Sequence, residues 1–418
     1  MLRLLSLAIA FALTPLISEA QESGSAWVGA WAHTPTAYDL TPPVSVTRAD
    51  GSAALRPPNY APAAPYRNVT VRQVTRVSAA GAALRLRLSN EFGARAIKIG
   101  GVSVALAGEN GAIVSGSARA VTFGGETTIS ISPGAPVVSD AVLLTFPALT
   151  KFAVSIYYSD ETTPPAHTLF ALDGYVSDEE RLAAAILPDA KPARNGNHLA
   201  QIEILAPAAT RAVVAFGDSL TEGVGSTRGA FRSWPDRLAE RLTATMPSAK
   251  WAVVNAGVGS NRLLRDTPSA NALARFDRDV LSVPGVAAGI IMLGVNDIQY
   301  ANRNAQDAVT ADEMIFALSQ LAQRGKVRGL RVYGGTITAF EGSPDYTPGG
   351  EAIRQKVNAW IRAGGAFDGV VDFDLATRDK ANPRMLSPAF DGGGHLHLND
   401  EGYAAMAGAV DLALFKGR

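Results

Sequence analysis

The hydrophobic periodicity of this chain changes near Ala206, and that change constrains its fold more than any other feature. Before it, apolar and polar residues alternate in short runs that are separated by turn residues. These runs are Val69–Val74, Leu84–Leu88, Ile97–Ile99, Thr128–Ile131 and Ala200–Leu205. A period of two is typical of strands with one buried face. The segment from Trp27 to Ala206 is therefore predicted to form an antiparallel β-sandwich.

After Ala206, apolar strands alternate with helical stretches. The predicted strands are Ala212–Phe216, Trp251–Asn255, Gly289–Leu293, Leu330–Tyr333 and Val370–Phe373. The predicted helices are Ser233–Met246, Asn271–Leu281, Asp312–Arg324, Gly350–Arg362 and Asp400–Phe415. This alternation indicates a parallel sheet with helices on both faces, so we predict a three-layer α/β/α domain of the flavodoxin-like type. The predicted domains are residues 21–206 and 207–418, and Pro42–Pro65 and Leu187–Asn197 are expected to be loops.

The first 20 residues have the pattern of a secretory signal. Arg3 precedes an apolar stretch, Leu4–Ile17, and Ser18–Ala20 has the small residues of a cleavage site. Pro15 and the shortness of the stretch disfavour a membrane anchor, because a spanning helix needs about 20 apolar residues. We therefore expect a mature chain that begins near Gln21, has no membrane span, and is secreted or periplasmic in a bacterium.

Composition excludes several classes of function. The chain has no cysteine, so disulfides, thiolate nucleophiles and cysteine-bound metals are excluded. Lysine plus arginine and aspartate plus glutamate both number 38, which gives a net charge of zero. A neutral chain argues against a nucleic-acid or anionic-membrane partner. The sequence leaves the oligomeric state open.

Four loops of the second half carry polar residues where the predicted strands end or the last helix begins. They are Gly217–Leu220, Asn255–Asn261, Gly294–Asp297 and Gly394–Asp400. Function in an open parallel sheet gathers at the carboxyl ends of the strands, so we expect these loops to lie together. They would bring a hydroxyl, a turn with backbone donors, an amide side chain and an imidazole to one edge.

This set of groups fits acyl transfer. A serine hydroxyl becomes a good nucleophile when a base such as histidine takes its proton. The tetrahedral intermediate carries an oxyanion that needs N–H donors placed in advance. The candidate donors are the backbone of Ser219, the amide of Asn296 and a backbone N–H from the turn that contains Gly257, Gly259 and Ser260.

Each candidate also has a structural interpretation. Ser219 alone could be a helix cap, since capping is the commoner use of serine. His397 could simply begin the last helix, and His395 competes with it as the base. With Asp391 or Asp400 the two histidines could bind Zn²⁺, but two histidines without a clear third ligand make a poor zinc site, so we predict no metal.

Other conspicuous residues are expected to be structural. Asp218 is expected to cap the next helix or bond to the site backbone. Asp297 is expected to orient the loop of Asn296. The residues expected to pack rather than bind are Trp31, His33, Tyr38 and Trp234.

The four loops resemble the sequence blocks of SGNH hydrolases, the GDSL family of esterases and lipases, in order from Val213 to Tyr403. The first half, which begins with Trp27–Trp31, resembles the β-rich N-terminal domain of a bacterial branch that includes carbohydrate acetylesterase-like proteins. The resemblance implies that Ser219 is the nucleophile, His397 the base and Asn296 an oxyanion donor. It implies a short-chain acyl or carbohydrate ester as substrate and no cofactor.

Three positions depart from the family pattern. The family glycine of the second block is Ser260, which can still donate its backbone N–H if its φ is permitted. The family proline after the histidine is Leu398. The family acid, three residues before the histidine, is Gly394, and the nearest upstream carboxylate is Asp391. We expect Asp391 or a backbone carbonyl to orient His397.

The missing acid keeps other functions open. A hydrolase that had lost turnover could act as a glycan-binding protein. A sugar O-acyltransferase would use the same residues and differ in whether water or an alcohol deacylates the enzyme. Measured turnover of esters distinguishes the binding protein from the two enzymes.

Overall fold

A computed structural model describes residues 24–38, 44–47, 53–56, 60, 63–246, 250–266, 269–303 and 307–416. The expected signal segment, residues 1–20, lies outside the described residues. Most of the expected Pro42–Pro65 loop also lies outside them, but β2 (Val44–Thr47) and β3 (Ala53–Arg56) pair as an antiparallel hairpin there. None of the helices in the described ranges is both long and apolar enough to cross a membrane.

The first half consists of antiparallel sheets, as the alternating runs predicted. One sheet joins β1 (Ser25–Ala32), β15 (Leu199–Pro207), β5 (Gly81–Ser89), β10 (Pro136–Val138) and β11 (Val142–Phe146). The other joins β14 (Lys191–Pro192), β13 (Gly174–Asp178), β4 (Val69–Arg76), β12 (Lys151–Tyr158), β7 (Gly101–Leu106) and β8 (Arg119–Val121). A further pair is β6 (Ile97–Ile99) and β9 (Ile129–Ile131).

The two larger sheets pack face to face. Phe146 of β11 meets Phe152 of β12 edge to face, with 5.0 Å between the ring centroids. Leu84 and Leu86 of β5 share one apolar core with Val154 of β12, and all three are fully buried. The alternation in the sequence therefore places its apolar positions between the sheets. The expected Leu187–Asn197 loop contains one short strand, β14.

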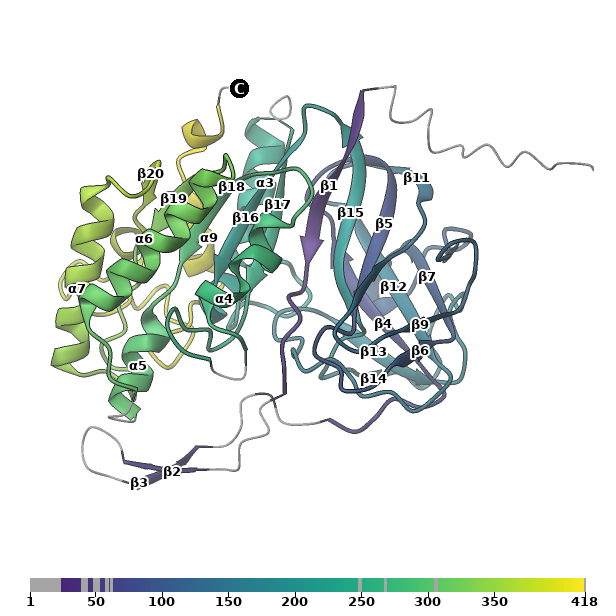
Figure 1. The fold of residues 1–418 in the computed structure, drawn as a ribbon, viewed down its shortest axis with the longest axis horizontal. Coiled ribbons are helices and arrows are strands. Elements are labelled where there is room, and N and C mark those ends of the chain that lie inside the picture. Colours follow the sequence, from purple (N-terminus) through teal and green to yellow (C-terminus); the bar gives the residue numbers. More distant parts are fainter. Residues whose placement is uncertain are drawn as a thin grey trace, which may run out of the picture.

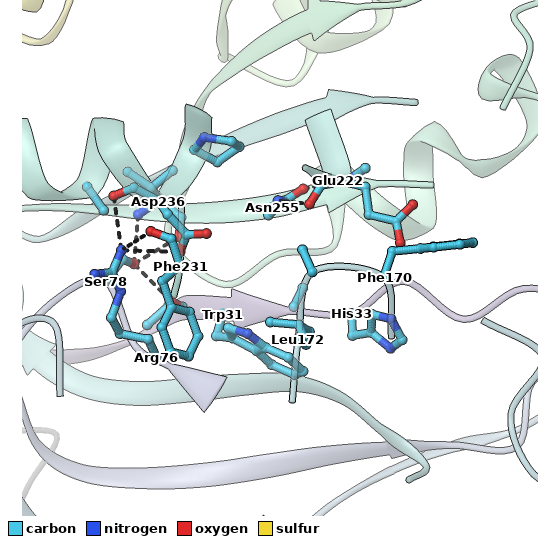
Figure 2. Close-up of a pocket in the computed structure, with 17 residues that line it drawn as sticks. Trp31, His33, Arg76, Ser78, Phe170, Leu172, Glu222, Phe231, Asp236 and Asn255 are labelled. Atoms are coloured by element: carbon cyan, nitrogen blue, oxygen red, sulfur yellow. Dashed lines mark hydrogen bonds and ion pairs between the residues drawn. The ribbon is translucent and has the colours of Figure 1, made fainter. Parts of the chain in front are cut away.

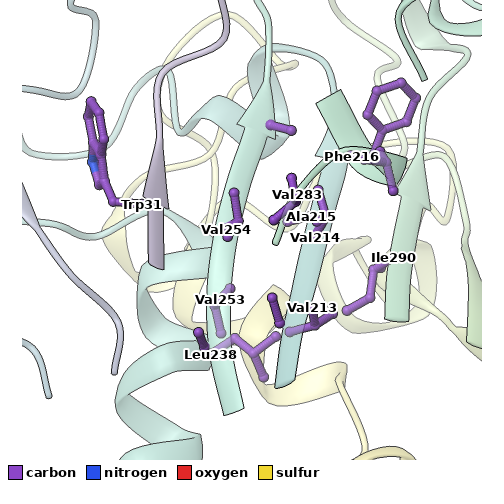
Figure 3. Close-up of a cluster of buried hydrophobic side chains, with 14 of the residues drawn as sticks. Trp31, Val213, Val214, Ala215, Phe216, Leu238, Val253, Val254, Val283 and Ile290 are labelled. Carbon is purple, nitrogen blue, oxygen red and sulfur yellow. The ribbon is translucent and has the colours of Figure 1, made fainter. Parts of the chain in front are cut away.

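The second half is a parallel sheet in the order β17 (Trp251–Gly257), β16 (Arg211–Gly217), β18 (Val286–Met292), β19 (Arg331–Gly335) and β20 (Gly369–Val371). The first strand of the half lies second in the sheet, which is the flavodoxin-like order. Its strands read as nearly continuous apolar runs because helices cover both faces. Figure 1 shows these helices on the two sides of the sheet, and Figure 3 shows the side chains buried around β16 and β17.

The predicted helices are present with some differences at their ends. The longer ones are α3 (Trp234–Thr245), α6 (Ala311–Val327), α7 (Pro348–Ala363) and α9 (Asp400–Ala409). The segment predicted as Asn271–Leu281 is α4 (Ala272–Phe276) followed by a π-helical turn, Asp277–Leu281. The segment predicted as Asp400–Phe415 ends as a helix at Ala409 and continues as a 3₁₀ turn, Leu412–Phe415. Three helices were not predicted: α2 (Ser219–Glu222), α5 (Val295–Arg303) and α8 (Phe373–Thr377).

Strand β1 contacts both halves of the molecule. It pairs with β15 on one side, and Figure 1 shows it next to β17 on the other. The N–H of Gly29 donates to the carbonyl of Pro284 at 2.9 Å. The hydroxyl of Ser78 bonds to the backbone of Ala30 and of Val253, each at 2.8 Å. A side chain at Gly29 would lie 2.6 Å from Val283, so this close approach requires glycine.

Candidate active site

Ser219 lies where β16 ends and the short helix α2 begins. Asp218 is the N-cap of that helix, and its Oδ1 accepts the N–H of Leu220 at 3.0 Å, which confirms the expected capping role. Gly223 ends the helix with a φ of 100°, a conformation that favours glycine. Ser219 is 7% exposed, so its hydroxyl faces a largely enclosed edge of the sheet.

The imidazole of His397 reaches this hydroxyl from the loop before α9. The distance from its Nε2 to Ser219 Oγ is 2.9 Å, across 178 positions of sequence. Gly225 makes the approach possible, because a Cβ there would lie 3.2 Å from the His397 Cβ and 2.7 Å from the Leu398 carbonyl. Burial lowers the pKa of His397 to about 4. The ring is therefore neutral near pH 7 and can accept the serine proton.

Asp391 does not reach His397 in this structure. Its Oδ2 lies 2.7 Å from Nδ1 of His395, and its Oδ1 accepts the backbone N–H groups of Gly393 and His395. A short carboxylate readily bonds to the backbone of its own turn, and this turn includes Gly394 at a φ of 116° and His395 at 58°. Within the described ranges, no hydrogen bond is made by Nδ1 of His397.

The alternative zinc site at the two histidines is not formed by these side chains. His395 pairs with Asp391, whereas His397 pairs with Ser219. The described residues contain one group of three suitably placed metal-ligating side chains, and it lies elsewhere, at His33, His167 and Glu222.

The candidate oxyanion donors come from the ends of β16, β17 and β18. The backbone N–H groups of Ser219 and Gly259 make no hydrogen bond to any described residue, whereas that of Gly257 donates to Asn255 Oδ1 at 2.9 Å. Asn296 uses Nδ2 to donate to the carbonyl of Asn261 at 3.1 Å, which leaves the second N–H of its amide for a ligand. Ser260 has a φ of 58°, so the position where the family has glycine does require a left-handed backbone.

Asn296 and Asp297 belong to the first turn of α5 rather than to a loop. The carboxylate of Asp297 accepts the N–H groups of Leu263 at 2.8 Å and Leu264 at 3.1 Å. It therefore orients the loop that follows β17, not a loop around Asn296. Burial raises the pKa of Asp297 to about 6.

Arg275 is a structural centre of the site that the sequence did not reveal. This arginine of α4 is 2% exposed and donates to the carbonyls of Gly217 at 2.7 Å and Ala256 at 3.0 Å. It also donates to Asn261 Oδ1 at 2.8 Å and to Asp279 Oδ2 at 3.0 Å. One guanidinium thus connects the ends of β16 and β17 to the loop that accepts the Asn296 amide.

The β-rich half contributes a second group of residues beside the catalytic loops. Tyr60 donates its hydroxyl to the Gly259 carbonyl at 3.3 Å. The ring of Phe170, which is 47% exposed, would lie 3.8 Å from a Cβ at Gly259. Farther along the same segment, the Ala171 carbonyl accepts the N–H of Gly229 at 2.9 Å. The segment around residues 167–172 therefore borders the loops that follow β16 and β17, and Figure 2 shows Phe170 of this segment beside Glu222 of α2.

A pocket between the halves adjoins the site without containing Ser219 or His397. Its lining includes Trp31, His33, Phe170, Leu172 and Glu222 (Figure 2). His33 and Trp31 were expected to pack, and both are buried. Trp234 was expected in the core and is fully buried.

Comparison with known proteins finds similarity in the second half of the chain. Residues 215–405 match the GDSL-like lipase/acylhydrolase family. No curated protein matches the chain. Among solved structures, a GDSL-like lipase from Bacteroides thetaiotaomicron is similar at 19% identity and a TM-score of 0.37, over 49% of this chain and 87% of that one. A catalytic mutant of an acetylxylan esterase from Geobacillus stearothermophilus is similar at 20% identity and a TM-score of 0.39, over 50% of this chain and 95% of that one.

Proposed function

Because residues 215–405 match the GDSL-like lipase/acylhydrolase family, we propose that this protein is a serine esterase that hydrolyses short-chain acyl esters, carbohydrate acetyl esters among them. The observation that carries the proposal is the 2.9 Å contact between Ser219 Oγ and His397 Nε2. A hydroxyl donating to a neutral imidazole is the starting arrangement of nucleophilic acyl transfer.

The proposed reaction proceeds in two steps. Ser219 Oγ attacks the ester carbonyl carbon while its proton moves to His397 Nε2. The carbonyl oxygen becomes an oxyanion that the Ser219 N–H, the Asn296 amide and the turn of Gly259 and Ser260 stabilise. The imidazolium then protonates the leaving alkoxide, and the alcohol departs. Water, deprotonated by His397, attacks the acyl-enzyme and releases the carboxylic acid.

The reaction proposed here uses a Ser–His pair without a charged third member. A carboxylate normally fixes the imidazole tautomer and stabilises the imidazolium. In this chain Asp391 is occupied by His395 and by its own turn. The contact between Ser219 and His397 supports turnover, so we propose a slow enzyme rather than an inactive one.

The choice of a carbohydrate ester rests on the β-rich half. That half resembles the corresponding domain of carbohydrate acetylesterase-like proteins, and it presents Phe170 beside the catalytic loops. An exposed aromatic face is suited to hold the alcohol portion of an ester through apolar contact. We further propose that the protein is exported from a bacterial cell, on the strength of the pattern in its first 20 residues.

Turnover on a panel of esters tests this function. Purified full-length protein is assayed on p-nitrophenyl acetate, butyrate and octanoate and on acetylated xylo-oligosaccharides, with Ser219→Ala as the inactive control. The proposal predicts turnover that falls with acyl length and disappears in the variant. If no ester is turned over and Ser219→Ala still binds glycan, the protein is a glycan-binding protein that has lost turnover. The absence of the family acid at Gly394 is the feature that motivates this alternative. Acyl transfer to an added sugar alcohol in preference to water would identify the acyltransferase.

A further inference from the structure

A buried group of three metal-ligating side chains lies at the junction of the two halves. His33 follows β1, His167 lies between β12 and β13, and Glu222 ends α2. One potential ligand atom from each residue lies within 4.8 Å of the other two. Figure 2 shows Glu222 and His33 around the same part of the interdomain pocket. The reaction proposed above uses none of the three.

One of the histidines is held by the backbone in the manner of a metal ligand. Nδ1 of His167 lies 2.7 Å from the carbonyl of Thr34. Nε2 of His33 is buried without a partner among the described residues, so it is available to an ion. Metal-bound histidines characteristically donate one ring N–H to a carbonyl and present the other nitrogen to the ion.

The carboxylate of Glu222 completes the group. Its Oε1 lies 3.1 Å from Nε2 of His167, and within the described ranges its Oε2 is buried without a partner. Oε2 of Glu222 and Nε2 of His33 are therefore both unsatisfied, in a group whose potential ligand atoms lie within 4.8 Å of one another. A buried polar atom that is left without a partner destabilises the folded state. A cation bound between them would remove both penalties at once.

We propose that His33, His167 and Glu222 bind a divalent transition-metal ion, for which Zn²⁺ is the best match. Two neutral imidazoles and one carboxylate form a common three-residue zinc set, with a fourth position left for water. Zinc bonds to nitrogen and oxygen are about 2 Å long, so ligand atoms must come within about 4 Å of one another. The two imidazole rings are stacked, with centroids 4.0 Å apart and planes 8° apart, so binding requires one ring to tilt out of the stack.

The ion would connect three segments that are far apart in the sequence. Glu222 is three residues after Ser219, and the two histidines belong to the β-rich half. Binding would therefore join the helix of the proposed nucleophile to the neighbouring half. Its main expected effect is on the stability of that junction, and it does not depend on the protein being an esterase.

Zinc titration of the full-length protein tests the site. After treatment with a chelator and its removal, Zn²⁺ is added and binding is followed by calorimetry, with metal content measured by mass spectrometry. We expect about one ion per chain and a rise in the melting temperature with Zn²⁺ concentration, because a ligand of the native state stabilises it. His33→Gln, His167→Gln and Glu222→Gln should each weaken binding at least about tenfold.

Two histidine variants serve as controls. His198→Gln removes a buried histidine that bonds to Tyr158, and His395→Gln removes an exposed histidine paired with Asp391. Both should bind Zn²⁺ as the unaltered protein does. Equal affinity in all five variants, or no uptake by the unaltered protein, would overturn the proposal and leave His167 and Glu222 as an ion pair.

Cobalt provides a measurement on the unaltered protein, in case a variant fails to fold. Co²⁺ in a site of two nitrogens, one carboxylate and water should give the intense visible absorption of a four-coordinate ion, which Zn²⁺ should abolish by displacement. The weak spectrum of a six-coordinate surface ion, or a spectrum unaffected by Zn²⁺, would contradict the proposed site.

Discussion

The two sides of the candidate active site are built differently. On the Ser219 side, the supporting residues Asp218, Arg275 and Asp297 are each at most 2% exposed and bond to backbone groups of the catalytic loops. On the other side, His397 follows an exposed glycine run with positive φ at Gly393, Gly394 and His395. The difference indicates that the proposed oxyanion donors are preorganised, whereas the proposed base, His397, is positioned with far less support.

This contrast has a chemical consequence. Preorganised donors act on the transition state without any cost of reorganisation at the moment of reaction. An imidazole without a carboxylate at Nδ1 loses stabilisation of its charged form, in line with the lowered pKa of His397. Most of the rate enhancement should therefore come from the Ser219 side.

The largest expected effect follows the loss of the nucleophile. Ser219→Ala should reduce kcat by several orders of magnitude, to the background that binding and the oxyanion donors provide. The matched control is Ser226→Ala, which removes a hydroxyl of the same turn that bonds to Gly223. Steady-state assays should show Ser226→Ala within a few-fold of the unaltered protein. Comparable losses in both variants would mean that the turn, not the Ser219 hydroxyl, is essential.

A smaller effect is expected for one oxyanion donor. Asn296→Ala should lower kcat by about 10²–10³ and change KM much less, because an oxyanion donor acts mainly in the transition state. The measurement is a full set of Michaelis curves, with thermal melting as the control for folding. A change in KM alone would reassign the Asn296 amide to substrate binding.

The pH dependence of kcat/KM tests how His397 is supported. His397 must be neutral to accept a proton, and its pKa is lowered to about 4 by burial. At pH 5 the enzyme should therefore retain about 90% of its plateau kcat/KM, whereas an ordinary histidine of pKa about 6.5 would retain about 3%. An acid limb with a midpoint near pH 6.5 would mean that a carboxylate or water network supports His397 in solution.

The contribution of Asp391 should be milder. Because its carboxylate bonds to His395 and to its own turn rather than to His397, Asp391→Asn and His395→Gln should each lower kcat by less than about tenfold. A loss of about 10⁴ in Asp391→Asn alone would identify Asp391 as the acid of His397. Gly394→Asp should not restore activity, since a φ of 116° strains any residue with a side chain. Gly394→Ala measures that strain without the charge.

The smallest expected effect concerns selectivity. Phe170→Ala should shift the ratio of kcat/KM between esters of bulky and small alcohols by a few-fold, at most about tenfold, because it removes one apolar contact beside Gly259. Phe316→Ala, which removes an exposed phenylalanine of α6, is the control. Equal ratios in both variants would show that the β-rich half does not contact the substrate.

The regular part of this fold was predictable because local sequence and tertiary burial agree. The apolar run Ala212–Phe216 lies in a strand covered on both faces, and Leu84–Leu88 alternates because β5 has one face in the core. Ser219 and His397 were also predictable, since Ser219 begins the helix after β16 and His397 lies in the loop before α9. The structure brings those two residues together as expected.

Other features depend on contacts that no local pattern encodes. The composition of Val295–Asp297 is typical of a turn, but in the structure the segment begins helix α5. The carboxylate of Asp297 accepts the N–H groups of Leu263 and Leu264, which are distant in sequence. Arginines on short helices are usually exposed, and nothing in the local sequence distinguishes Arg275 from them. In the structure Arg275 is nevertheless buried. His33, His167 and Glu222 meet from positions more than 50 residues apart, so no spacing rule could have joined them.

The position of β1 affects the order in which the chain can fold. This strand is the first of the described sheets along the chain, but its partner β15 ends at Pro207 and its neighbour β17 ends at Gly257. Pairing over such separations closes long loops before any contact is gained, which slows folding. During synthesis, β1 (ending at Ala32) must therefore wait until β15 has been made, through Pro207, before it can pair, and until β17 has been made, through Gly257, before its other side is covered. The sheet of the first half can consequently close before the second half is made, and the bonds from Gly29 to Pro284 and from Ser78 to Val253 form last.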